Sequence, residues 1–258
     1  MRSETTSAAP NHIDYGVIRA FLWSGIVVVV SVVVAGAWLM GYIPPPSPAM
    51  SAQDFLEFVR SHRTGILAGG AIAVVLWSFW TTWPVPIIIL IRRMEGTPVL
   101  TYASLALLGS TSAIITIIAV AWSIMAFRAE NAAIVQAFND FAFYMFLYTW
   151  PPFGLWMAII AVAIFRDINP EPIFPRWVAY YNIMSAWLMA PATLIGVFKS
   201  GPFAYNGLLS FWLFVAEFLI WMVVMVIVTF RAFAKLERQE KSTTPEGPLT
   251  ARVSPRQG

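Results

Sequence analysis

The chain has 258 residues, of which 59% are hydrophobic and only 11% are charged, and its formal net charge is +3. A soluble domain carries about 25% charged residues, so this composition excludes a fully water-exposed fold and does not point to nucleic acid. The chain has no cysteine, which excludes disulfides and thiolate metal sites. It has only two histidines, both outside the apolar runs, which argues against His-ligated metal sites.

Six almost uncharged apolar runs follow one another along the chain. A helix rises about 1.5 Å per residue and the hydrocarbon core of a bilayer is about 30 Å thick, so each run is long enough to span it. The first run is too long for a signal peptide, whose apolar region is about 7–15 residues. We predict an all-α, six-span bundle over residues 17–240, between a flexible tail (1–16) and a disordered cytoplasmic tail (241–258). The predicted spans are residues 20–43, 65–91, 103–127, 140–165, 177–198 and 208–230.

The segment after the first span begins with prolines at 44–46 and 48, which cannot continue a helix. Ser51 then stands three residues before Asp54, a pattern that favours a helix N-cap. Phe55, Phe58 and Val59 share one side of the helix that follows. The sequence therefore predicts a short amphipathic helix in the membrane interface.

Small residues and prolines shape the second span. Gly65, Gly69 and Ala73 form a ridge that lets another helix approach closely. The ridge has two readings, an oligomer interface or packing inside the bundle, and we favour packing inside the bundle. Pro84 and Pro86 predict a kink near the far end of this span.

The fourth span carries polar side chains on one face. Asp140, Tyr144 and Tyr148 are spaced by four residues, and Pro151 and Pro152 follow them, so we predict a kink there. Asp140 has two interpretations. It either caps the start of this helix or marks the mouth of a pathway that runs inward along the two tyrosines, and we favour the cap.

The most unusual residue is Glu217, the only carboxylate deep in an apolar run. An ionised carboxylate at mid-bilayer costs about 2.5 kcal/mol or more, so Glu217 needs a proton, a partner or a wet cavity. One interpretation is a ligand or proton pathway that also includes Asn182 on the fifth span, a helix kinked at Pro191. The other is a neutral Glu217 hydrogen-bonded to a Tyr, Trp, Asn or Ser of the bundle.

The distribution of basic residues predicts the orientation. Twelve of the sixteen Lys and Arg lie on the side that holds both termini, and the other side holds only Arg60, Arg63, Arg128 and Lys199. The positive-inside rule then predicts that both termini are cytoplasmic and that the short amphipathic helix is external, in the cell (inner or plasma) membrane. Beyond the sixth span, a helical stripe predicts contact with anionic lipid. Its residues are Arg231, Lys235 and Arg238.

Short motifs accompany the six spans. The segment 92–96 (Arg-Arg-Met-Glu-Gly) follows the second span, 139–141 (Asn-Asp-Phe) opens the fourth, and 174–177 (Phe-Pro-Arg-Trp) opens the fifth. In these features, over about residues 15–235, the chain resembles uncharacterised multi-pass membrane proteins of bacteria. The resemblance implies the six-span fold and brings no activity or site with it.

Two functional readings stay open at this point. The first is a protein that binds or transports a small lipophilic molecule, with Glu217, Asp140, Tyr144, Tyr148 and Asn182 along the path. The second is a non-catalytic accessory or assembly subunit, which associates with a membrane partner subunit or a second copy of itself. No phosphate-binding loop, dinucleotide fingerprint, serine elbow or zinc-protease motif is present, so we expect no catalytic residues, metal or cofactor. The third possibility is an intramembrane enzyme whose chemistry uses none of these motifs.

Overall fold

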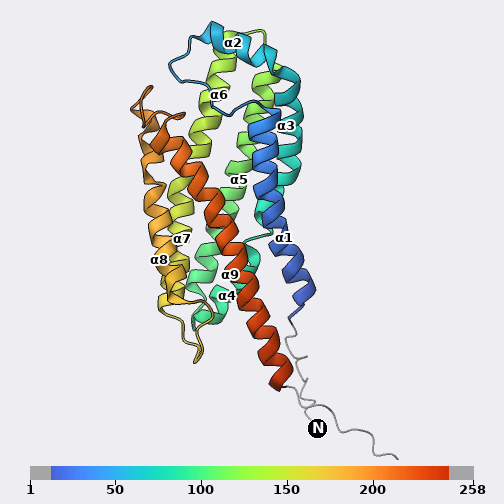
Figure 1. The fold of residues 1–258 in the computed structure, drawn as a ribbon, viewed down its shortest axis with the longest axis vertical. Coiled ribbons are helices and arrows are strands. Elements are labelled where there is room, and N and C mark those ends of the chain that lie inside the picture. The colour runs from blue at the N-terminus through green and yellow to red at the C-terminus, as the bar shows by residue number, and fades with distance from the viewer. Residues whose placement is uncertain (1–12, 244–258) are drawn as a thin grey trace, which may run out of the picture.

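The computed structural model describes residues 13–243, and every regular element in this range is a helix. Six helical segments are long and apolar enough to cross a membrane, which confirms the six-span, all-α prediction. They are Tyr15–Leu39, Arg63–Met94, Val99–Phe127, Ala132–Phe165, Arg176–Gly196 and Leu208–Ser242. They run along one long bundle, with helix α2 at one end and the N-terminal part of the chain toward the other (Figure 1). Most of the two predicted tails lies outside the described residues.

The first span consists of α1 (Tyr15–Ser31) and the π-helix η1 (Val32–Leu39). Asp14 caps α1, because its carboxylate accepts hydrogen bonds from the amides of Gly16 and Val17. The span therefore begins at Tyr15, inside the segment that we expected to be a flexible tail.

Helix α2 (Ala52–Ser61) lies across the end of the bundle, next to α6 (Figure 1). The side chain of Ser51 accepts a hydrogen bond from the amide of Asp54, which confirms the predicted N-cap. Phe55 and Val59 are buried under this helix. Its place in the bilayer interface stays a prediction.

The second span consists of α3 (Arg63–Leu76), a 3₁₀ segment η2 (Trp77–Thr81) and α4 (Val85–Met94). Regular α-helix is therefore lost just before Pro84 and resumes after it. At the other end, a Cβ added to Gly65 would lie 2.1 Å from the carbonyl oxygen of Leu39. The small-residue ridge thus packs on the first span of the same chain, as expected.

The third and fourth spans are α5 (Val99–Phe127) followed by α6 (Ala132–Leu147) and α7 (Trp150–Phe165). Asn131 caps α6, accepting from the amides of Ala133 and Ile134. Asp140 lies in the interior of α6, so the prediction that it caps this span is wrong. The turn between α6 and α7 falls at residues 148–149, directly before the two prolines.

The last two spans consist of α8 (Arg176–Leu188), the 3₁₀ segment η3 (Ala190–Gly196), the π-helix η4 (Leu208–Trp212) and α9 (Leu213–Thr243). Pro191 lies in η3, where regular α-helix has already ended. The C-terminal end of α9 extends beyond the other helices in Figure 1, and the part of α9 before it packs against α1.

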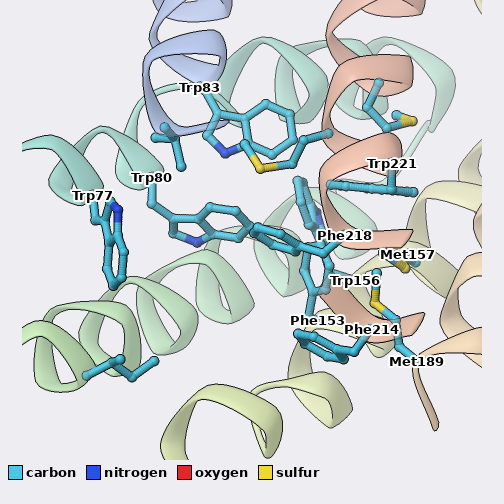
Figure 2. Packing of buried hydrophobic residues seen from close by; sticks show 14 of the residues in the cluster. Trp77, Trp80, Trp83, Phe153, Trp156, Met157, Met189, Phe214, Phe218 and Trp221 are labelled. Atoms are coloured by element: carbon cyan, nitrogen blue, oxygen red, sulfur yellow. The ribbon is translucent and has the colours of Figure 1, made fainter. Parts of the chain in front are cut away.

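An aromatic cluster from the second, fourth and sixth spans fills the centre of the bundle (Figure 2). We define it as Trp80, Trp83, Phe153, Trp156, Phe218 and Trp221, all of them buried. The Trp80 ring stacks on Phe218 at 5.7 Å between centroids, and Phe153 meets Trp221 edge-on at 4.9 Å. Such ring pairs add roughly 0.5–1.5 kcal/mol beyond the area that they bury.

Candidate functional site

The structure places Glu217 at the interface between α9 and α8, with only 8% of the residue exposed. The hydroxyl of Ser185 on α8 donates a hydrogen bond of 2.5 Å to Oε1 of Glu217. No ion pair among the described residues includes Glu217. Its partner is therefore a neutral hydroxyl of the bundle.

Asn182 lies one turn away from Ser185 on α8 and is fully buried. Its Oδ1 accepts a hydrogen bond of 3.0 Å from the indole nitrogen of Trp221, and its Nδ2 donates to the carbonyl oxygen of Val178. The hydroxyl of Tyr181 is buried beside Ser185 and Glu217 but makes no well-aligned hydrogen bond. Glu217 and Asn182 thus belong to one polar patch between the fifth and sixth spans.

Asp140, Tyr144 and Tyr148 form a separate group on α6. The rings of Tyr144 and Tyr148 meet edge-on at 5.2 Å, and a Cβ added to Gly196 would lie 2.5 Å from the Tyr148 hydroxyl. This face therefore lies against η3. The structure shows no hydrogen bond that joins this group to Glu217 or Asn182, within residues 13–243.

A chain of polar groups leads from Asp140 toward the interior. The carboxylate of Asp140 interacts with the hydroxyl of Tyr205, which accepts a hydrogen bond of 3.1 Å from Nδ2 of Asn139. The hydroxyl of Tyr42 donates to Oδ1 of Asn139 at 3.3 Å. Burial raises the pKa of Tyr42 and of Tyr205 well above the ordinary value near 10, and the charge of Asp140 adds to the rise at Tyr205. Both phenols therefore stay protonated and keep their donor roles at neutral pH.

Tyr42 forms part of the wall of an apolar cavity, which we call the aromatic cavity. It has a volume of about 100 Å³ and lies among the first, second, third, fourth and sixth spans. Aromatic rings make up half of its wall: Tyr42, Trp77, Trp80, Trp122, Phe143, Phe146, Phe211 and Phe218. Trp80 and Phe218 also belong to the aromatic cluster (Figure 2), whose other members follow further along the second, fourth and sixth spans.

Three departures from regular α-helix meet at the aromatic cavity. The π-helix η1 contributes Val32, Gly36 and Ala37, the 3₁₀ segment η2 contributes two tryptophans, and the π-helix η4 contributes Phe211. Stretches of π-helix are rare and are found often at functional sites. A Cβ added to Gly36 would have no atom within 4 Å, so the chain leaves open space at this point of the wall.

None of the five residues that the sequence suggested as a pathway lines the aromatic cavity. The cavity lies instead among aromatic side chains that the sequence analysis did not single out as a site. The available signal was the run of Trp77, Trp80 and Trp83 directly before Pro84, which places large rings where the helix must change course.

The three basic residues at the end of α9 differ in their surroundings. Nζ of Lys235 lies 2.9 Å from the carboxylate of Glu171 in the preceding loop. Arg231 and Arg238 are exposed, and both Arg231 and Lys235 line a surface hollow of about 310 Å³ beside Trp177. Contact of this stripe with anionic lipid stays a prediction, with Arg231 better placed for it than Lys235.

Within the described residues, no three His, Cys, Asp or Glu side chains come together in a group that could hold a metal ion. Comparisons of the chain with family models, with curated proteins and with solved structures found no match.

Proposed function

We propose that this multi-pass membrane protein binds a small lipophilic molecule in its aromatic cavity. The observation that carries the proposal is the meeting of η1, η2 and η4 around one apolar space. Departure from α-helix weakens backbone hydrogen bonding, and π-helical stretches are rare and found often at functional sites, so two of them beside a 3₁₀ segment favour a binding site here.

The size and walls of the cavity suit such a ligand. An engineered apolar cavity of roughly 150 Å³ stays dry and binds benzene. The space of about 100 Å³ is smaller but only partly enclosed, so it accommodates a short piece of hydrocarbon chain, or one ring that extends into the opening. Binding is better supported than transport, because the buried, mutually packed rings of Trp83, Trp156 and Trp221 fill the bundle beyond the cavity along the second, fourth and sixth spans.

The separation of the first and sixth spans suggests how a ligand reaches the cavity. Helix α1 packs against α9, whereas η1 has few contacts with it, and the two spans diverge toward the α2 end in Figure 1. The cavity wall on this side includes Gly36, Ala37 and Val215, which are partly exposed, and Ile43, which is 51% exposed. An opening here faces the hydrocarbon of the bilayer, where lipophilic molecules are concentrated.

Native mass spectrometry of the full-length protein tests this proposal. We expect the wild-type protein to retain a small lipophilic molecule from its membrane, and the Gly36→Leu variant to lose it because leucine fills the open space. Gly109→Leu is the matched control, since Gly109 is an exposed glycine of α5 with no atom within 4 Å of an added Cβ. Ala37→Leu provides a second filled variant if Gly36→Leu folds poorly.

Two results would overturn the proposal. One is equal retention of the molecule by the wild type and both filled variants, which would place it elsewhere. The other is a wild-type protein that retains only a partner subunit, and no small molecule even after incubation with total membrane lipid extract. That outcome would favour the accessory-subunit reading.

A further inference from the structure

The wall of the aromatic cavity is made almost wholly of carbon, although several of its residues carry polar atoms. Where those atoms lie decides which ligands the cavity accepts, because a buried polar group on a ligand needs a partner. The four polar side chains of the wall are Tyr42, Trp77, Trp80 and Trp122.

Two of these four residues use their polar atoms in the protein itself. The indole nitrogen of Trp80 donates a hydrogen bond of 3.0 Å to Oγ1 of Thr111. The hydroxyl of Tyr42 donates to Asn139 and also lies 3.5 Å from the sulfur of Met125. Neither donor is available to a ligand without breaking a buried hydrogen bond.

The other two residues point their polar atoms into the packing. The indole nitrogens of Trp77 and Trp122 are fully covered by neighbouring atoms and have no acceptor among the described residues. The two rings meet edge-on at 6.3 Å, and Trp122 also packs on Tyr42 at 5.3 Å. These contacts hold the indole planes in place, so the rings present carbon to the cavity.

We propose that the aromatic cavity selects a hydrocarbon group and rejects an isosteric group that carries oxygen. This inference rests on the proposed function and names its ligand class: the ring or chain end of a membrane-dissolved molecule, with any polar group of that molecule outside the cavity. A carbonyl oxygen in the cavity would lose its hydration and find no donor, which costs about 1–3 kcal/mol, equivalent to roughly a 5- to 150-fold loss of affinity.

A matched pair of probes tests the selection. Methylenecyclohexane and cyclohexanone have the same ring and nearly the same shape, and they differ by a C=CH₂ group in place of a C=O group. The full-length protein is labelled with 5-fluorotryptophan, reconstituted in nanodiscs and titrated with each probe at equal concentration in the bilayer. Fluorine resonances of Trp77, Trp80 and Trp122 report binding, and each is assigned from the corresponding Trp→Phe variant.

We expect methylenecyclohexane to shift these resonances in a saturable way and cyclohexanone to bind at least about fivefold more weakly. Both responses should disappear in Gly36→Leu and persist in Gly109→Leu. If cyclohexanone binds as tightly as methylenecyclohexane or more tightly, hydrocarbon selection is wrong while the proposed function stands. If neither probe gives a saturable shift in the wild-type protein, and native mass spectrometry detects no retained molecule, both proposals fail.

Discussion

The Ser185 hydroxyl donates a hydrogen bond to Glu217 across the interface between α8 and α9, at 2.5 Å. This contact joins the fifth and sixth spans at a point where both residues are buried. It also supplies the kind of partner that the second interpretation of Glu217 requires, a neutral hydroxyl of the bundle. In the aromatic cavity, by contrast, Glu217 forms no part of the wall.

Substitutions at Glu217 distinguish a bundle contact from a charged site. Glutamine keeps the acceptor for Ser185, and no cation within residues 13–243 pairs with Glu217, so we expect Glu217→Gln to change the free energy of unfolding by less than about 0.5 kcal/mol. Glu217→Ala removes the contact and leaves a void, with an expected loss of roughly 2–4 kcal/mol. Ser185→Ala should cost about 1 kcal/mol.

Unfolding of the purified protein in mixed micelles, with increasing amounts of denaturing detergent, measures these differences. Far-ultraviolet circular dichroism of each variant before titration serves as the control for folding. If Glu217→Gln destabilises the protein as much as Glu217→Ala, the negative charge itself matters, and the structural interpretation of Glu217 is wrong.

Substitution by alanine should have opposite effects on stability at two helical glycines, Gly65 and Gly109. A Cβ at Gly65 would lie 2.1 Å from the carbonyl oxygen of Leu39, and backbone cannot move aside cheaply, so Gly65→Ala should cost more than about 2 kcal/mol. At Gly109 the space is open, and alanine should stabilise the helix by about 0.5–1 kcal/mol. Thermal unfolding in one detergent compares both variants, and a Gly65→Ala variant as stable as wild type would contradict the close packing of α3 on η1.

The number and type of the spans follow from length and apolarity alone, because a helix that crosses a bilayer has little freedom in either. The predicted start of the fourth span, at Asp140, is wrong for a local reason. Asp140 looks like a cap next to the apolar run after it, but Asn131 precedes Ala-Ala-Ile-Val, which extends the helix by two turns. The residues around Asp140 do not by themselves show whether it begins the helix or lies inside it. Only the stronger N-cap upstream, Asn131, decides between the two positions.

The aromatic cavity could not be predicted from the sequence, again for a physical reason. The sequence does not distinguish a tryptophan that lines a cavity, such as Trp77, from one that fills the core, such as Trp83. The π-helical form of η1 and η4 also depends on how neighbouring spans pack, since nothing in their apolar sequences specifies a π-helix. The sequence indicated only an interrupted helix near Pro84, and the structure shows which other spans pack around it.

The basic stripe of α9 leads to a graded expectation for anionic lipid. Arg231 and Arg238 are exposed, whereas Lys235 already pairs with Glu171. We expect Arg231→Gln to lower the phosphatidylglycerol that co-purifies with the protein by about half, and Lys235→Gln to lower it much less, because an exposed charge near the surface contributes about 1 kcal/mol. Quantitative lipid mass spectrometry measures both, with Arg128→Gln at the opposite end of the bundle as control. Equal losses at all three positions would indicate a nonspecific effect of net charge.

The carboxylate of Glu95 holds the start of α5 and makes its stability depend on pH. Burial alone would raise the pKa of Glu95, but hydrogen bonds from the Thr101 hydroxyl and from the amides of Leu100 and Thr101 outweigh it, and the pKa lies below the ordinary value near 4.5. A lowered pKa in the folded state stabilises the fold above the unfolded pKa, and that contribution is lost as the pH falls through the folded value.

We expect Glu95→Ala to cost about 1 kcal/mol at pH 7, as for other helix caps, and the gap to the wild type to close in acid below the ordinary value. Unfolding measured in detergent from neutral to acidic pH follows this gap, with Glu57→Ala on the exposed side of α2 as the matched control. A gap that stays constant into acid would mean that Glu95 stabilises α5 without its charge.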